Sequence, residues 1–104
     1  MASRKKNKWE ESIIPDNNEF CYLCKKKGLT VRGTDCHHMV YGTAKRKLAD
    51  EDGLHVQLCH LHHMMLHQQG YYREELQQYA EQMWLNHYGK TIDDWIQRYG
   101  KNFL

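Results

Sequence analysis

The sequence lacks long apolar stretches and has very little proline. Its 104 residues include one proline and seven glycines, so it is not a low-complexity chain. No run of about 18 apolar residues occurs, which argues against a membrane-spanning helix. No apolar segment follows the basic start at Arg4–Lys8, as a secretory signal would require. We therefore expect one cytoplasmic domain with no membrane partner, in a compartment where thiols stay reduced.

The sequence also carries no large excess of positive or negative charge. The formal net charge is +2, which alone does not indicate a nucleic-acid partner. Basic residues nevertheless gather in three clusters, at Arg4–Lys8, Lys25–Lys27 and Lys45–Lys47. Such clusters can bind phosphates, although each one alone is better explained as a solvated surface.

The local patterns divide the chain into three parts. Residues 1–18 are polar and basic and predict a flexible arm, and residues 71–104 predict a helical extension. Between them, residues 19–70 predict a compact α+β core. Within this core we expect a metal-binding turn at 19–28, an extended segment at 30–40, a polar loop with at most a helical turn at 41–53, a strand at 54–58 and a helix at 60–69.

Two helices are expected in the C-terminal extension. Apolar residues recur at helical spacing in two groups: Leu76, Tyr79, Ala80, Met83 and Trp84, and then Ile92, Trp95, Ile96 and Tyr99. Thr91 and Asp94 resemble a capping box at the start of the second helix. We expect the tryptophans of both groups to be core residues, because their spacing matches burial.

The four cysteines are better explained as metal ligands than as disulfides in a reducing compartment. Structural zinc prefers four thiolate or imidazole ligands in two short-spaced pairs, and small domains often depend on such a metal. Cys21/Cys24 and Cys59/His62 supply two such pairs. A Cys2His2 finger that uses Cys24 and His37 fails, because no histidine follows at the required spacing. We therefore expect one structural Zn²⁺ at these four residues.

Histidines are concentrated in the middle of the chain, where seven of the eight lie between His37 and His67. His37, His38, His63 and His67 remain after the zinc ligands are removed. His63 and His67 are four residues apart on the expected helix and lie on one face, so they can bind one metal. His62 points away from that face. One helix can therefore serve zinc and a second metal.

The order and spacing of these patterns resemble the HNH endonuclease family, in its zinc-containing subgroup. The resemblance covers about residues 20–70 and rests on Cys21-x-x-Cys24, Asp35-Cys36-His37-His38-Met39, and Leu54-His55-Val56-Gln57-Leu58-Cys59 followed by His62, His63 and His67. The segment His87–Thr91 is similar to that of short phage-type members. The resemblance implies a zinc-stabilised ββα-metal core with two C-terminal helices, in a bacterial or phage-encoded protein.

Roles follow from this resemblance residue by residue. It implies that His37, His63 and His67 hold a divalent catalytic metal and that His38 is the general base. The family's asparagine corresponds to His55 here, so His55 either braces the loop or joins the metal. Arg46, with Lys45 and Lys47, could contact DNA phosphates, although a solvated loop is the simpler explanation of Arg46. A histidine-rich site accepts Mn²⁺, Ni²⁺ or Zn²⁺ better than Mg²⁺.

The expected activity is metal-dependent hydrolysis of DNA phosphodiester bonds. One alternative is a zinc-stabilised DNA-binding module without catalysis, which would not need the second group of histidines. Another is a metal-binding or interaction protein with no nucleic-acid role, for which DNA binding would be weak or independent of salt. The sequence leaves open whether the chain works alone, as a homodimer or beside phage packaging proteins.

Overall fold

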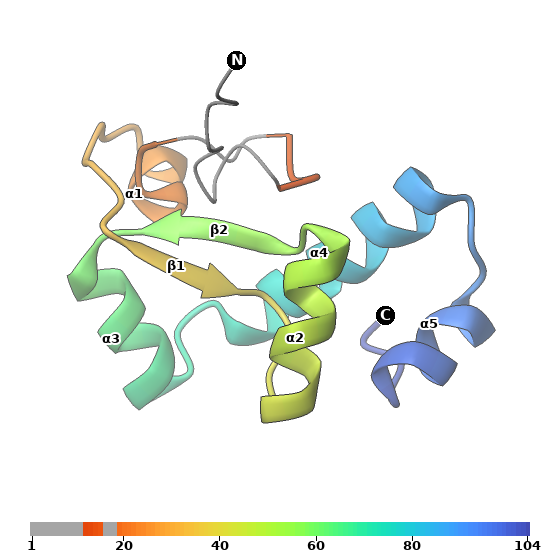
Figure 1. Ribbon diagram of the computed structural model, residues 1–104. Helices are drawn as coiled ribbons and strands as arrows, with labels where there is room; N and C mark the ends of the chain where they lie inside the picture. The colour runs from red at the N-terminus through yellow and green to blue at the C-terminus, as the bar shows by residue number, and fades with distance from the viewer. Residues whose placement is uncertain (1–11, 16–18) are drawn as a thin grey trace, which may run out of the picture.

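The computed structural model describes residues 12–15 and 19–104 and has an α+β architecture (Figure 1). Its elements follow the order α1 (Tyr22–Lys26), β1 (Asp35–His38), α2 (Thr43–Asp52), β2 (His55–Leu58), α3 (His60–Gln69), α4 (Arg73–Tyr88) and α5 (Ile92–Tyr99). Most of the expected arm, including the cluster Arg4–Lys8, lies outside the described residues. No described helix combines the length and apolar character that crossing a membrane requires.

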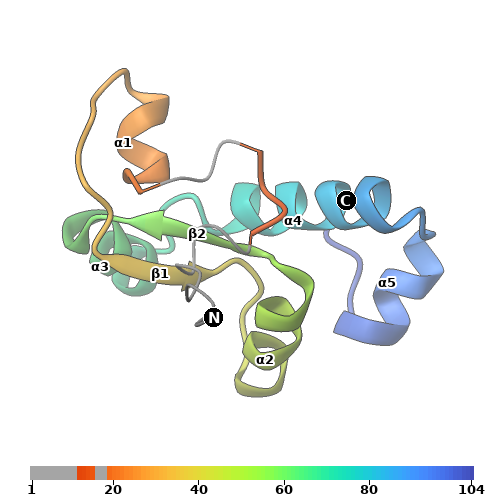
Figure 2. The same cartoon turned by 45° about the horizontal axis from the view of Figure 1, so that its top comes forward.

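The two strands form an antiparallel pair at the centre of the molecule. Asp35 pairs with Leu58 and His38 with His55, so the register brings the paired histidines of β1 next to the start of β2. Every residue of β2 is buried, whereas β1 is half-buried apart from His37. The helices α1 and α3 lie at one end of the pair, and α2 leaves from the other end (Figures 1 and 2).

The strand β1 is shorter than the extended segment that we expected over 30–40. Upstream of it, Arg32 forms an isolated bridge with Phe20. At Gly33 the backbone passes so close to β2 that an added Cβ would lie 2.6 Å from Cβ of Gln57. Glycine therefore allows the close approach of these two segments.

The helix α2 corrects the prediction for residues 41–53, which were expected to form a loop with at most a helical turn. A ten-residue helix stands there, and it ends at Gly53 in the left-handed conformation (φ 73°). Its sequence is rich in alanine, lysine, arginine and leucine, which favour helices. Its last residue, Asp52, accepts hydrogen bonds from Trp84, Arg98 and Tyr99 of α4 and α5. These hydrogen bonds between distant parts of the chain hold α2 in place. They cannot be predicted from the local sequence of the helix.

The helix α1 stands within residues 19–28, where a metal-binding turn was expected, whereas α3, α4 and α5 agree with their predicted positions. The helix α3 spans 60–69 and ends at Gly70, as expected. The capping box at α5 is confirmed, with the Thr91 side chain accepting from the Asp94 backbone and the Asp94 side chain accepting from the Thr91 backbone. Trp84 and Trp95 are buried in the core and their ring centroids are 5.4 Å apart.

One apolar cluster runs through both the strand pair and the C-terminal helices. It includes Leu58 of β2, Leu66 of α3 and Trp95 of α5. Ile14 extends it at the N-terminal side, and the neighbouring Ser12 hydroxyl donates a hydrogen bond to the carbonyl oxygen of His55 at 2.6 Å. This shared core fixes the positions of the elements that carry the cysteines and histidines.

Candidate functional site

Two groups of side chains that could bind a metal ion meet around α3. Cys21, Cys24, Cys59 and His62 form the first group, and His37, His63 and His67 form the second. Within each group, one ligand atom from every residue lies within 4.8 Å of the others. We refer to them as the cysteine cluster and the histidine cluster. The structure therefore brings together both sets of ligands that were expected from the sequence.

The cysteine cluster joins the start of α1 to the start of α3. The Nδ1 atom of His62 lies 3.4 Å from Sγ of Cys21, 3.3 Å from Sγ of Cys24 and 3.4 Å from Sγ of Cys59. The thiols of Cys24 and Cys59 are 3.8 Å apart. A tetrahedral zinc ion about 2.3 Å from sulfur and about 2.1 Å from nitrogen places its ligand atoms about 3.5–3.8 Å apart. This cluster can therefore hold a structural metal such as zinc.

The thiols of this cluster are poorly solvated. Burial and the neighbouring thiols of Cys21 and Cys59 raise the pKa of the Cys24 thiol to about 12. Burial also opposes ionisation of Cys21, but hydrogen bonds from the backbone of Cys59 and Cys24 outweigh it and lower the pKa of Cys21. A bound cation would favour the thiolate form of all three, since thiolates are the species that bind zinc.

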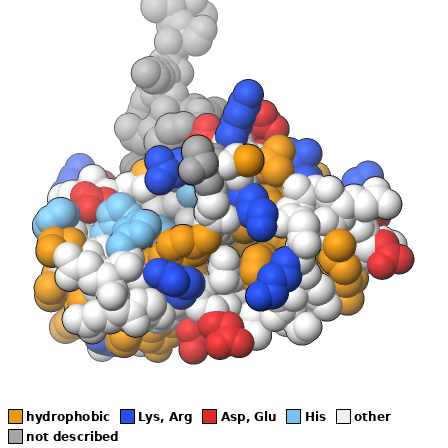
Figure 3. All heavy atoms as spheres, turned by 90° about the horizontal axis from the view of Figure 1, so that it is seen from below, with side chains coloured by type: hydrophobic (Ala, Val, Ile, Leu, Met, Phe, Trp, Pro, Cys, Tyr) orange, Lys and Arg blue, Asp and Glu red, His pale blue; other side chains and the backbone are white. Residues whose placement is uncertain are grey.

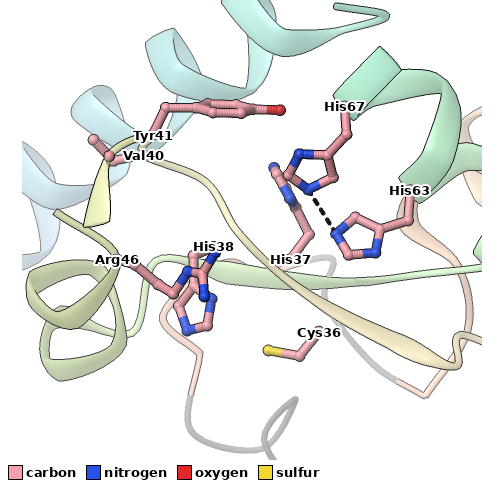
Figure 4. A pocket seen from close by; sticks show the side chains of 9 residues that line it. Cys36, His37, His38, Val40, Tyr41, Arg46, His63 and His67 are labelled. Atoms are coloured by element: carbon pink, nitrogen blue, oxygen red, sulfur yellow. Dashed lines mark hydrogen bonds between the residues drawn. The ribbon is translucent and has the colours of Figure 1, made fainter. Parts of the chain in front are cut away.

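The histidine cluster is built from β1 and α3. His37 projects from the strand, and its ring centroid lies 5.5 Å from that of His63 and 5.7 Å from that of His67. His63 and His67 lie one turn apart on α3, with their Nε2 atoms 3.0 Å apart (Figure 4). A divalent ion about 2.1 Å from each of two imidazole nitrogens separates them by roughly 3–3.5 Å.

His37 has the strongest indication of a missing partner. Its side chain is buried, and Nε2 has no hydrogen-bond partner among the described residues. Burial, followed by the nearby charges of His63 and His67, lowers the pKa of His37 to about 3. The ring is therefore neutral near pH 7, which is the form that binds a metal ion. These three residues fit a divalent metal.

The histidine cluster opens onto a cavity of about 440 Å³. Its lining includes His38, Tyr41 and Arg46, together with the three clustered histidines. Arg46 is exposed, whereas Lys45 is not among the lining residues, and its Nζ atom lies 3.7 Å from the position of a Cβ on Gly100. Lys47 is exposed on the same helix. Figure 3 shows histidine side chains at the surface, with lysine and arginine side chains beside them.

His38 stands apart from the histidine cluster. It lies on the same strand as His37, in the next position, and Figure 4 shows it near Arg46 rather than among the three rings. Its Nε2 atom lies 3.3 Å from Oδ1 of Asp50 on α2. His55 is fully buried, and its ring centroid is 6.1 Å from that of His38. Neither cluster of the described residues includes His55.

Three residues near the site were given no functional role from the sequence. Asp35 accepts hydrogen bonds from His60 and His63, Asp50 contacts His38, and Arg73 stacks on Tyr41. The position of Asp35 does carry a signal, because residues two apart on a strand share a face and Asp35 precedes His37 by two. Asp50 and Arg73 reach the site through tertiary packing, which no local spacing predicts.

Comparison of the chain with protein-family models, curated proteins and solved structures found no match.

Proposed function

We propose that this chain is a metal-dependent endonuclease of the HNH type, which hydrolyses phosphodiester bonds in DNA. The observation that carries the proposal is the histidine cluster: three imidazoles converge on the wall of an open cavity, and the buried Nε2 of His37 has no partner among the described residues. The arrangement of β1, β2 and α3 around this cluster supports a ββα-metal core. The cysteine cluster would serve as its structural zinc site.

His37, His63 and His67 would hold the catalytic metal. When bound, a divalent ion neutralises the charge of the phosphate and stabilises the leaving 3′-oxygen. The cluster offers imidazole nitrogens and no carboxylate ligand within the described residues, a donor set that favours Mn²⁺, Ni²⁺ or Zn²⁺ over Mg²⁺.

His38 would accept a proton from the attacking water. With the ring proton on Nε2 and donated to Asp50, Nδ1 keeps its lone pair for that proton. Asp50 would orient the ring and stabilise the imidazolium that forms, as a carboxylate does for a catalytic histidine. His55 packs against His38 from the buried side, so its role would be to support the position of that ring.

Arg46 would contact the DNA phosphate, because its side chain lines the cavity beside His38. Lys47 would add a more distant phosphate contact from the exposed face of α2. Lys45 is directed toward Gly100, so we assign it the weakest share of DNA binding among the three. Binding should weaken steeply as the salt concentration rises.

The test is cleavage of supercoiled plasmid DNA with Mg²⁺, Mn²⁺, Ni²⁺ or Zn²⁺, beside an EDTA control. We expect nicking that depends on the metal and is lost in His38→Ala, with zinc content unchanged. His87→Ala is the matched control, because His87 is exposed on α4 and lines no part of this cavity. Absence of cleavage with every metal would refute the proposal. If that protein still bound zinc and bound DNA in a salt-dependent way, a non-catalytic DNA-binding module would replace it.

A further inference from the structure

Tyr41 carries a second buried polar atom beside the histidine cluster. Its side chain lines the cavity, and its hydroxyl is buried with no hydrogen-bond partner among the described residues. Figure 4 shows the ring extending so that the hydroxyl lies on the side of His67 and His37. The ring centroid of Tyr41 is 5.6 Å from that of His67 and 5.9 Å from that of His37.

The Tyr41 ring is held in this position from its other side. The guanidinium carbon of Arg73 lies 4.3 Å from the ring centroid, as in a cation–π contact. Arg73 in turn lies 3.5 Å from the carbonyl oxygens of Leu66 and His67 near the end of α3. The hydroxyl is therefore fixed relative to the helix that supplies two of the three clustered histidines.

The surroundings of this hydroxyl select for an anion. A buried hydroxyl without an acceptor is unfavourable, so the missing partner should be an acceptor. Arg46 lines the same cavity and Arg73 stacks on the ring, whereas no aspartate or glutamate is among the described lining residues.

We propose that the Tyr41 hydroxyl donates a hydrogen bond to a non-bridging oxygen of a phosphate group bound at the histidine cluster. One side of the cavity then binds the metal through His37, His63 and His67. The other side binds the phosphate through Tyr41 and Arg46. This assignment rests on the proposed function for the identity of the substrate. Tyr41 is thus a substrate-binding residue that the sequence patterns do not reveal.

The test measures binding of inorganic phosphate, which separates this inference from DNA cleavage. Protein with zinc in the cysteine cluster and Co²⁺ in the histidine cluster is titrated with phosphate by calorimetry. We expect Tyr41→Phe to bind phosphate about tenfold more weakly than the wild type, the effect of one hydrogen bond to a charged group. Tyr88→Phe is the control, because the Tyr88 hydroxyl has its own partner in the carbonyl oxygen of Asp52. That control should bind phosphate as the wild type does.

Three results would overturn the assignment. Equal phosphate affinity in Tyr41→Phe and wild type would remove Tyr41 from the site while leaving the nuclease proposal intact. A changed Co²⁺ absorption spectrum in Tyr41→Phe without phosphate would make the hydroxyl a metal ligand instead. Failure of the Co²⁺-loaded wild type to bind phosphate would refute the phosphate site itself. Conversely, Tyr41-dependent phosphate binding in a protein that cleaves no DNA would sustain the site and refute only the nuclease.

Discussion

Asp35 and His63 form a hydrogen bond in which Nδ1 of the ring lies 2.9 Å from Oδ2 of the carboxylate. When Nδ1 donates its proton to Asp35, Nε2 keeps its lone pair and faces Nε2 of His67 at 3.0 Å. Hydrogen bonds from His63 and then His60 lower the pKa of Asp35 to about 2, so the carboxylate is ionised near neutral pH. Carboxylates in this position fix the tautomer and the orientation of a metal-binding histidine.

Replacement of this carboxylate should weaken the histidine cluster without disturbing the cysteine cluster. We expect Asp35→Ala to reduce the Co²⁺ affinity of the histidine cluster by about 10–100-fold, the usual effect of removing such a partner. Titration followed by absorption would measure it, with bound zinc determined in parallel. Asp93→Ala is the control, since Asp93 is exposed on α5. Unchanged Co²⁺ affinity in Asp35→Ala would mean that packing alone orients His63.

The cysteine cluster should contribute directly to folding. It connects α1 to α3, and structural zinc adds its binding energy to the stability of the fold. We expect Cys59→Ala to lose zinc and to lower the melting temperature markedly. Cys36→Ala should retain zinc, because Cys36 belongs to neither cluster of the described residues. Elemental analysis and thermal unfolding would measure both effects, and zinc retention in Cys59→Ala would contradict this ligand set.

The sequence predicted the parts of the fold that depend on local spacing. Glycine at the end of α3, the Thr91 capping box and the burial of Trp84 and Trp95 all follow from neighbours within a few turns. The cysteine and histidine clusters were also predicted, because the geometry of a metal ion restricts the spacing of the cysteines and histidines that could bind it.

The features that the sequence did not predict depend on distant partners. The helix α2 looked like a polar loop because its anchor, Asp52, meets its partners about 30–50 residues further along the chain. The Tyr41 ring and the Arg73 guanidinium are far apart in the sequence and meet only through tertiary packing. Side chains of this kind have no fixed spacing from the residues they serve, so no local pattern reveals them.

The anchor at Asp52 gives a stability prediction. Its buried carboxylate lies 2.6 Å from Nε of Arg98, 2.6 Å from the Tyr99 hydroxyl and 2.9 Å from Nε1 of Trp84. Removal of one partner from such a network leaves the others unpaired, so Asp52→Ala should lower the free energy of unfolding by about 3 kcal/mol or more. Urea unfolding of the zinc-loaded protein would measure it.

Glu51→Ala is the matched control for this network. Glu51 also contacts Arg98, at 3.2 Å, but it is exposed. Exposed ion pairs contribute little to stability, so Glu51→Ala should lower the free energy of unfolding by less than about 1 kcal/mol. Similar losses in the two variants would show that the contact with Arg98 stabilises α2 regardless of burial, and would refute the role given to Asp52.

Glu81 provides the pH-dependent prediction. Its side chain is fully buried on α4, where Oε1 accepts from the backbone N–H of Phe103 at 2.7 Å and Oε2 has no partner among the described residues. Burial raises the pKa of Glu81 despite that hydrogen bond. A carboxyl with a raised folded-state pKa binds its proton more tightly in the folded state. Its stabilising effect is therefore present at low pH and is lost as the pH rises through the folded-state pKa.

Glu81→Gln should remove the cost of holding an ionised carboxylate in the core at neutral pH. Glutamine keeps an oxygen that accepts from the Phe103 N–H, and it cannot ionise. We expect the variant to unfold at higher urea concentration than the wild type at pH 7, and the difference to shrink as the pH falls toward 4.5, the usual value for glutamate. Other groups that titrate are common to both proteins and cancel in the difference. A difference that does not depend on pH would mean that Glu81 and glutamine differ in packing rather than in charge.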